Sequence, residues 1–319
     1  MRELLIHIGR HKTGTTAIQH FLQDNRAALR EHGYWVPNAG RVHAAHHDFA
    51  RPLQPRNADQ IKGVTDLSLL TPYVDLRQEL AGKNPSYRVI VSSEGFQNCR
   101  PEPVREAFQG YRASIIVYLR NQLEYLASSY AQRVHATQYA GSLQDFHRDL
   151  HLKGSNYASF LRGWKQQFPE RFLVRRYQAD NIVTDFIEHA LALPSEPFHL
   201  REARSNPSLN SVVTEFKRQL NDRQPDNAPP QLQIYPILPG LNALFPAPKF
   251  AMTAETASDL IERCKPFDNE VATTYFEGAQ LFDYSSFETR PTVHLSDSAF
   301  ADMYAALLEL AAEAPAEAS

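Results

Sequence analysis

A short segment rich in glycine, threonine and basic residues is the clearest chemical feature of this sequence. Residues 9–16 read Gly-Arg-His-Lys-Thr-Gly-Thr-Thr, and the four residues between Gly9 and Gly14 match the spacing of a P-loop. An apolar run, Leu4 to Gly9, leads into the loop, and an amphipathic stretch from Ala17 to Leu29 follows it. Backbone N–H groups of such a loop, together with the positive end of the following helix, bind phosphate. The segment therefore predicts a strand, a phosphate loop and a helix.

The lysine of this loop departs from the pattern of nucleotide triphosphatases. Thr15 stands where those proteins place the lysine, and Lys12 lies inside the loop instead. We also find no acidic residue suited to hold magnesium at the ends of the later predicted strands. These departures disfavour a P-loop kinase, which stays an alternative. The other alternative is a Gly/Thr-rich turn that merely begins a helix.

A second group of phosphate-binding types follows a later predicted strand, Ile115 to Leu119. Arg120 comes directly after this strand, and Ser128 lies about two turns into the helix predicted for Gln122 to Val134. An arginine fork supplies charge-assisted hydrogen bonds, and a hydroxyl adds a further donor. The spacing therefore predicts that Arg120 and Ser128 bind one phosphate together.

Both segments resemble the motifs of sulfotransferases that use 3′-phosphoadenosine 5′-phosphosulfate (PAPS). Residues 11–16, His-Lys-Thr-Gly-Thr-Thr, are similar to the 5′-phosphosulfate loop of this family, which commonly reads Pro-Lys-Ser-Gly-Thr-Thr. In residues 120–130 the arginine, asparagine, serine and tyrosine of the family's 3′-phosphate motif fall in register, while Gln122 and Glu124 replace its usual proline and aspartate. A softer similarity at residues 175–180 extends the resemblance over roughly residues 1–195.

The resemblance implies the cofactor and several residue roles. PAPS would be the co-substrate, adenosine 3′,5′-bisphosphate the product, and no metal would be required. Lys12 would stabilise the charge that develops on the leaving phosphate oxygen. The implied nucleotide-binding residues are Arg10, His11, Lys12, Thr13, Gly14, Thr15, Thr16, Arg120 and Ser128.

One part of the family pattern is absent from the sequence. Cytosolic members close over the 3′-phosphate with a late Arg-Lys-Gly segment, which we do not find here. Arg201, Arg204 and Lys217 are candidates for a substitute. Each also fits a solvated surface charge, which is the favoured interpretation.

The catalytic base is expected near the end of a buried strand. Glu94 follows the run Val89 to Val91, and open α/β sheets build their sites at the carboxyl ends of their strands. Sulfotransferases that act on glycans often have a glutamate in this position. We expect partial burial to raise the pKa of Glu94, which would make it a competent base. A helix-capping or ion-paired glutamate is the structural alternative.

Three histidines offer a different base or a metal site. His43, His46 and His47 are separated by three and four residues, which would place them on one helical face. The spacing allows a zinc site, but Asp48 is the only carboxylate or thiol beside them, so we expect no metal. One of these histidines could instead line the acceptor pocket or act as the base.

The order of the predicted elements indicates an α/β fold. Apolar runs at 89–91, 115–119 and 172–174 alternate with helix-like segments, which predicts a three-layer P-loop-type fold whose central parallel sheet is flanked by helices. We expect a single domain, 1–319. Its PAPS-binding α/β core would span 1–200, with an irregular insertion at 38–87. Residues 201–319 would form a mainly helical extension in which Pro236 to Pro248 is irregular.

Composition narrows the function classes further. The chain has 319 residues with 33 basic and 36 acidic side chains, so its formal charge is −3, and we expect no nucleic-acid partner. We find no apolar run that could span a membrane and no export signal, and with two cysteines we expect a cytoplasmic protein. The predicted reaction moves a sulfuryl group from PAPS to a hydroxyl, or less favourably an amine, of a glycan or other small molecule. A nucleotide-binding module without catalysis is the non-enzymatic alternative, and the oligomeric state stays open.

Overall fold

The computed structural model describes residues 1–149, 156–178, 180–201, 209–225 and 228–313. The chain forms two compact units. The first contains residues 1–120 and 157–204, and the second contains residues 121–156 and 205–319. Residues 121–156, which the sequence assigned to the α/β core, thus cluster with the carboxyl-terminal helices.

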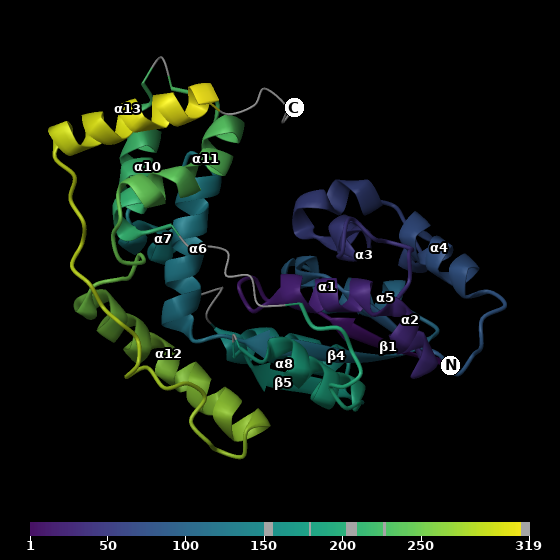
Figure 1. Cartoon of the computed structure of the whole chain (residues 1–319). Coiled ribbons are helices and arrows are strands. Elements are labelled where there is room, and N and C mark those ends of the chain that lie inside the picture. The colour runs from purple at the N-terminus through teal and green to yellow at the C-terminus, as the bar shows by residue number, and fades with distance from the viewer. Residues whose placement is uncertain (150–155, 179, 202–208, 226–227, 314–319) are drawn as a thin grey trace. The chain divides into compact units, whose positions relative to one another are not determined.

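The first unit is built on a parallel sheet (Figure 1). All four strand pairs are parallel, and the strand order is β2-β3-β1-β4-β5. The strands are β1 (Arg2–His7), β2 (Tyr34–Trp35), β3 (Arg88–Ser92), β4 (Tyr111–Leu119) and β5 (Phe172–Arg176). This arrangement confirms the predicted α/β fold with a central parallel sheet. The short strand β2 was not predicted.

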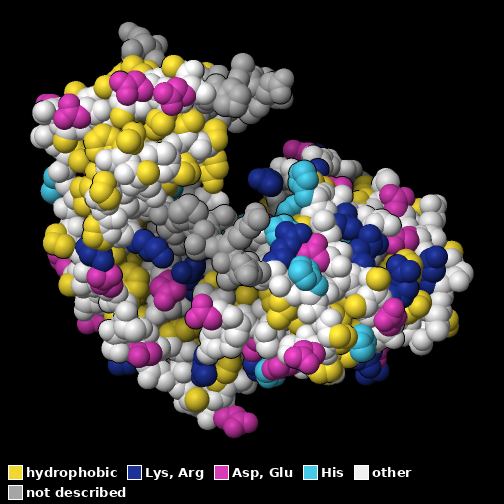
Figure 2. Space-filling model, viewed as in Figure 1, with side chains coloured by type: hydrophobic (Ala, Val, Ile, Leu, Met, Phe, Trp, Pro, Cys, Tyr) yellow, Lys and Arg dark blue, Asp and Glu magenta, His cyan; other side chains and the backbone are white. Residues whose placement is uncertain are grey.

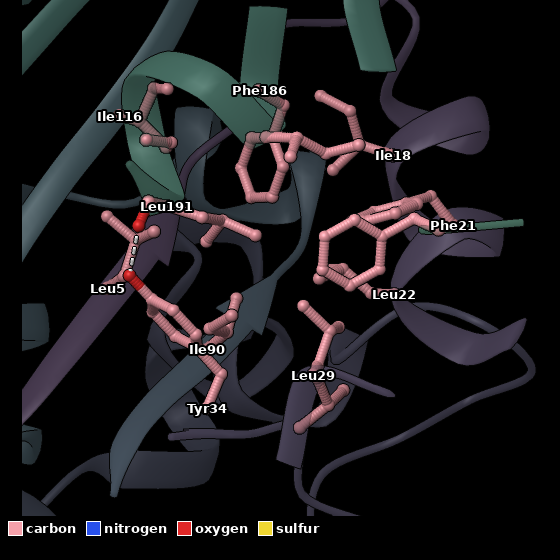
Figure 3. Packing of buried hydrophobic residues seen from close by; sticks show 14 of the residues in the cluster. Leu5, Ile18, Phe21, Leu22, Leu29, Tyr34, Ile90, Ile116, Phe186 and Leu191 are labelled. Atoms are coloured by element: carbon pink, nitrogen blue, oxygen red, sulfur yellow. Dashed lines mark hydrogen bonds between the residues drawn. The ribbon is translucent and has the colours of Figure 1, made fainter. Parts of the chain in front are cut away.

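Helices cover both faces of this sheet. On one face, Leu5, Ile90 and Ile116 pack in a cluster with side chains of α1 (Thr15–Asp24) and of the π-helix η5 (Phe186–Leu191) (Figure 3). Successive side chains of a strand point to opposite faces, and Leu4 and Ile6 are buried as fully as Leu5. Other helices of this unit are α2 (Arg26–Glu31), α5 (Pro101–Ala107), α8 (Tyr157–Gln167) and α9 (Ile182–Asp185).

The strand order brings three connections together. β1 lies between β3 and β4 in the sheet. Along the chain, α1 follows β1, η4 (Glu94–Asn98) follows β3 and α6 (Gln122–Ala136) follows β4. Because the carboxyl ends of parallel strands meet at one edge, the segments that follow β1, β3 and β4 are neighbours there. This edge is where ligands bind in open α/β sheets.

Residues 38–87 form short helices, whereas the sequence predicted an irregular insertion. They are α3 (His47–Ala50), the 3₁₀ helices η1 (Arg51–Leu53), η2 (Pro55–Ile61) and η3 (Leu67–Leu69), and α4 (Thr71–Leu80). Phe49 and Tyr73 are buried here, and the Tyr73 hydroxyl donates to the Phe49 carbonyl at 2.6 Å. The segment therefore has its own apolar contacts despite its prolines. A further 3₁₀ helix, η4 (Glu94–Asn98), follows β3.

The second unit is helical in the residues that the structure describes. Its helices are α6 (Gln122–Ala136), α7 (Leu143–Asp149), α10 (Ser211–Arg223), α11 (Gln231–Leu244), α12 (Ala254–Tyr275) and α13 (Asp297–Glu313). The prediction of irregular structure from Pro236 to Pro248 was wrong for residues 236–244, because α11 continues to Leu244. Ile234, Leu238 and Leu241 are buried in a cluster with α10 and α13, and this burial outweighs the cost of the two prolines within the helix. Figure 2 shows apolar side chains gathered over this part of the unit.

The sequence analysis also considered membrane-spanning segments and the two cysteines. Among the residues that the structure describes, no helix is both long and apolar enough to cross a membrane. Cys99 and Cys264 are both buried thiols.

Candidate functional site

The predicted phosphate loop turns sharply between β1 and α1. Gly9, Lys12 and Gly14 all have left-handed backbone conformations, with φ of 71°, 65° and 71°. A Cβ atom on Gly9 would lie 2.6 Å from the Cα of Glu94, so only glycine allows the loop to touch the end of β3. Thr13 closes the turn by donating its hydroxyl to the Arg10 carbonyl at 2.6 Å. The sequence therefore placed the loop and its glycines correctly.

The loop presents the amino end of α1. Gly14 is the N-cap of this helix, and in the described part of the chain no side chain caps the first turn, which begins at Thr15. Thr15 is buried, whereas Thr16 and His11 are exposed. Uncapped N–H groups and the helix dipole together favour an anion at this position.

Two cations from separate strand ends meet at the loop. The Arg120 guanidinium donates to the Lys12 carbonyl at 2.9 Å and lies 5.4 Å from the centre of the Tyr177 ring. Burial, and then the Arg120 charge, lower the pKa of the Lys12 ammonium. An anion bound between the two side chains would relieve their repulsion.

Arg10 occupies an aromatic pocket beside the loop. Its side chain is buried, and its guanidinium carbon lies 4.7 Å from the ring centre of Phe160 and 5.1 Å from that of Tyr157. The Tyr157 hydroxyl in turn donates to the Arg120 carbonyl at 2.7 Å. Helix α8 thereby supports both arginines, which the sequence did not predict because α8 lies far along the chain.

Ser128 belongs to the second unit. It is half-buried on α6, whereas Arg120 is the last residue of the first segment of the first unit. Its joint action with Arg120 on one phosphate stays a prediction. The Asn121 side chain has a local role, since it accepts the Leu123 N–H at 3.0 Å and caps α6.

Glu94 lies just beyond β3, as predicted, but its protonation differs from the expectation. Its Oε2 accepts a hydrogen bond from Gln19 Nε2 at 2.7 Å. Burial raises the pKa of this carboxyl, but the Gln19 hydrogen bond, its own N–H and the nearby His47 and His11 together lower it below its ordinary value. The expected rise was wrong because partial burial came with hydrogen-bond donors. Gln19 was missed, although a glutamine beside Ile18 on an apolar helix face was a possible signal.

The three clustered histidines have separate roles rather than one helical face. α3 begins only at His47, and His43 is exposed with a left-handed φ of 56°. His46 is fully buried, its Nδ1 accepts the Ser92 N–H at 3.1 Å, and its Nε2 lies 3.1 Å from the Pro37 carbonyl. His47 Nδ1 lies 2.9 Å from Ser93 Oγ.

No metal centre is found in the described residues, where no group of three or more His, Cys, Asp or Glu side chains is placed to hold an ion. The zinc alternative required His43, His46 and His47 to act together. The two ring nitrogens of His46 already have protein partners.

The candidate substitutes for the late family segment have other contacts. Arg201 is an exposed residue of the first unit and forms an ion pair with Asp24 at 2.5 Å. Lys217 lies in the second unit and is buried, contrary to the expected surface charge, and its Nζ donates to the Thr137 carbonyl at 3.3 Å and to Asn221. Burial lowers the pKa of Lys217 to about 8. Arg204 lies outside the described residues.

Comparison with known proteins gives distant similarities. No protein-family model matches the chain. An uncharacterized protein of Archaeoglobus fulgidus is 32% identical over 143 residues, which cover 42% of this chain and 38% of that protein. The match therefore spans well under half of that relative's length.

Three solved structures resemble this chain, with low TM-scores and low sequence identities. A sulfotransferase from Alicyclobacillus acidocaldarius has a TM-score of 0.45 at 13% identity and covers 86% of this chain and 95% of its own. Retinol dehydratase bound to androsterone and the inactive cofactor PAP has a TM-score of 0.27 at 11% identity, over 100% of this chain and 83% of its own. The same enzyme bound to retinol and PAP gives 0.27 and 11%, over 100% and 84%. Values this low assign no activity to the chain.

Proposed function

We propose that this protein transfers a sulfuryl group from PAPS to an acceptor hydroxyl and releases adenosine 3′,5′-bisphosphate. The hydrogen bond from Arg120 to the Lys12 carbonyl carries the proposal. It joins the two motifs that resemble the 5′- and 3′-phosphate sites of PAPS-dependent sulfotransferases, although they are 108 residues apart in the chain. A nucleotide with phosphates on both sides of its ribose would use the cations of both motifs at once.

The residues divide the work of sulfuryl transfer. The amides of Gly14, Thr15 and Thr16 would hold the 5′-phosphate at the amino end of α1. Arg120 would bind the 3′-phosphate, and Arg10, His11 and Thr13 would shape the loop around the nucleotide. The acceptor oxygen attacks the sulfur, its proton passes to Glu94, and the bond from sulfur to the 5′-phosphate oxygen breaks. Lys12 stabilises the charge that remains on that oxygen.

The acceptor is proposed to be a glycan or another small molecule. A glutamate at the end of β3 supports this choice, since the resemblance associates that position with carbohydrate acceptors. No metal ion takes part in the proposed reaction, because Lys12, Arg120 and the loop amides compensate the phosphate charges.

Calorimetric titration tests which nucleotide the protein binds. We expect micromolar, metal-independent binding of adenosine 3′,5′-bisphosphate that exceeds the binding of ADP and ATP. Arg120→Ala should weaken it about tenfold or more, because it removes charge-assisted hydrogen bonds. Arg112→Ala is the matched control, since Arg112 is an exposed arginine at the opposite end of the same strand, β4, and should bind as the wild type.

Two other outcomes would replace the proposal. Equal or magnesium-dependent binding of ATP would indicate a P-loop kinase. Glu94→Gln distinguishes a catalyst from a binding module. A sulfotransferase should keep its affinity for the bisphosphate and lose most of its rate, whereas a binding module has no rate to lose.

A further inference from the structure

The Glu94 carboxylate has one oxygen engaged and one directed at a histidine. Gln19 donates to Oε2 at 2.7 Å, while Oε1 lies 3.8 Å from His47 Nε2. A distance of 3.8 Å is too long for a hydrogen bond. One oxygen atom placed about 2.8 Å from both atoms, an ordinary hydrogen-bond distance, would bridge them. Glu94 and His47 are both partly exposed, so a ligand has access to this gap.

Ser93 determines which nitrogen of His47 carries the proton. Ser93 is fully buried, and its Oγ accepts the Gly95 N–H at 3.1 Å and lies 2.9 Å from His47 Nδ1. These are the two partners of Ser93 Oγ within the described chain. A buried hydroxyl hydrogen is normally donated, and here its acceptor is Nδ1. The proton of the neutral His47 ring is therefore on Nε2, which faces Glu94.

The neighbouring residue holds this arrangement in place. His46 binds the backbone of Ser92 both through its ring and through its own N–H, which donates to the Ser92 carbonyl at 2.8 Å. The insertion is thus attached to the end of β3 directly beside Ser93 and Glu94. A fixed backbone on both sides keeps the His47 N–H and the Glu94 oxygen at their separation.

We propose that His47 Nε2–H and Glu94 Oε1 hold the acceptor hydroxyl between them and thereby select hydroxyl acceptors over amines. This inference rests on the proposed sulfuryl transfer. A hydroxyl oxygen has two lone pairs, so one accepts from His47 while the other attacks sulfur and the proton passes to Glu94. An amine nitrogen has a single lone pair and cannot accept from His47 and attack at the same time. In the transfer, the oxygen–sulfur bond forms as the bond from sulfur to the 5′-phosphate breaks, and the electrons of that bond remain on the phosphate.

The charges around Glu94 agree with its role as proton acceptor. His47 on α3 and His11 in the phosphate loop act on the carboxylate, whereas burial lowers the pKa of His7 at the end of β1 to about 4 and leaves its ring neutral. Arg10 and Lys12 act on His11 in turn. Burial of Glu94 favours its neutral form, but the hydrogen bonds and then His47 and His11 hold its pKa below the ordinary value. The carboxylate is therefore ionised at neutral pH and can accept a proton, although it is a weaker base than a carboxylate of raised pKa.

Nitrogen-15 NMR of the full-length protein tests the geometry without any acceptor. We expect the His47 ring to be the Nε2–H tautomer, with its signals assigned by their loss in His47→Leu and their retention in His43→Leu. His43 is an exposed histidine of the same insertion and serves as the matched control. Ser93→Ala should release the preference for this tautomer. An Nδ1–H tautomer in the wild type would overturn the proposal.

Transfer of labelled sulfate from PAPS tests the selection. The probes are matched acceptors in which an amino group replaces the single hydroxyl, phenol against aniline and 2-naphthol against 2-naphthylamine. We expect the wild type to label the hydroxyl of each pair about tenfold faster than the amine, the value of one hydrogen bond. His47→Leu should slow transfer to the hydroxyl and lower the ratio of the hydroxyl rate to the amine rate. His47→Gln keeps an N–H donor, so it should retain most of this ratio.

The outcomes separate this inference from the proposed function. An unchanged ratio in His47→Leu would overturn the hydroxyl selection while leaving sulfuryl transfer intact. Failure to bind adenosine 3′,5′-bisphosphate would overturn sulfuryl transfer itself. In that event the tautomer of His47 still decides whether its N–H faces Glu94.

Discussion

His46 and His47 are adjacent in the chain and do different work. His46 has both ring nitrogens within hydrogen-bonding distance of backbone groups and is fully buried, so it fixes the insertion to the end of β3. His47 is partly exposed and directs its ring at Glu94. A buried histidine with two protein partners is a structural residue, and the site chemistry falls to its neighbour.

Protonation of His46 should destabilise the fold in acid. Burial lowers the pKa of His46 from 6.5 to about 4 and that of His7 to about 4 as well. Between these values the unfolded chain binds a proton that the folded chain does not, so stability is lost as the pH falls below 6.5. The loss for each histidine is roughly 2 kcal/mol by about pH 5.

Urea unfolding of the wild type and of His46→Gln at several pH values measures this effect. The variant should be less stable at pH 7, because it loses fitted hydrogen bonds, but its stability should fall less steeply toward acid. Equal slopes for the two proteins would show that His46 titrates normally in the folded state.

In the second unit, a three-residue ring of contacts links two helices. Gln122 of α6 donates from Nε2 to Asp268 Oδ1 of α12, and the Tyr284 hydroxyl contacts both Asp268 Oδ2 and Gln122 Oε1. Tyrosine has a single hydroxyl proton, so all three contacts become hydrogen bonds only if Asp268 Oδ2 is protonated. Burial raises the pKa of Asp268, and the bonds from Tyr284 and Gln122 offset this only in part.

Asp268→Asn should therefore stabilise the protein at neutral pH. The amide supplies at every pH the donor that the carboxyl loses on ionisation, so the free energy of unfolding should rise by about 1 kcal/mol. Because a raised carboxyl pKa costs stability as the pH rises, the gain should shrink in acid. Chemical denaturation at neutral and acidic pH measures it.

Two further variants control for this ring. Tyr284→Phe should destabilise by about 1–2 kcal/mol, because it leaves buried partners of its hydroxyl unpaired. Asp259→Asn, the same exchange at an exposed position of α12, should change stability by less than about 0.5 kcal/mol. Destabilisation by Asp268→Asn would mean that Asp268 is ionised in the folded protein.

At the scale of the whole molecule, each of the two units is formed by two separate segments of the chain. The first unit is interrupted by residues 121–156, which belong to the second. In the second unit, Leu123 and Leu126 of α6 pack in a cluster with Met252 and Leu260. A cut at residue 200 would therefore separate α6 from the residues that bury it.

A chain of residues 1–200, the predicted nucleotide-binding core, should accordingly not behave as an independent domain. We expect it to aggregate or to bind a hydrophobic dye, because the apolar face of α6 becomes exposed. Gel filtration and dye fluorescence measure this against the full chain. A monomeric 1–200 chain with cooperative unfolding would show instead that the sheet unit folds without the second unit.

Local patterns predicted those elements whose residues are neighbours in the chain. The strands of the sheet and the loop between Gly9 and Gly14 follow from apolar runs and glycine spacing, which are short-range signals. β2 was missed because it has two residues, and α11 was missed because Pro236 and Pro239 argue against a helix unless burial overrides them. The membership of α6 in the second unit depends on contacts with residues far along the chain.

For the candidate site, the sequence indicated which residues belong to it, but not which groups surround each of them. Lys12, Glu94 and Arg120 could be selected because each follows a buried strand of a parallel sheet. The pKa of Glu94 depends on Gln19, which is 75 residues away, and the difference between His46 and His47 depends on Ser92 and Ser93, which are 46 residues away. Propensity and periodicity act over a few residues, whereas protonation and hydrogen bonding depend on whichever groups the folded chain places in contact.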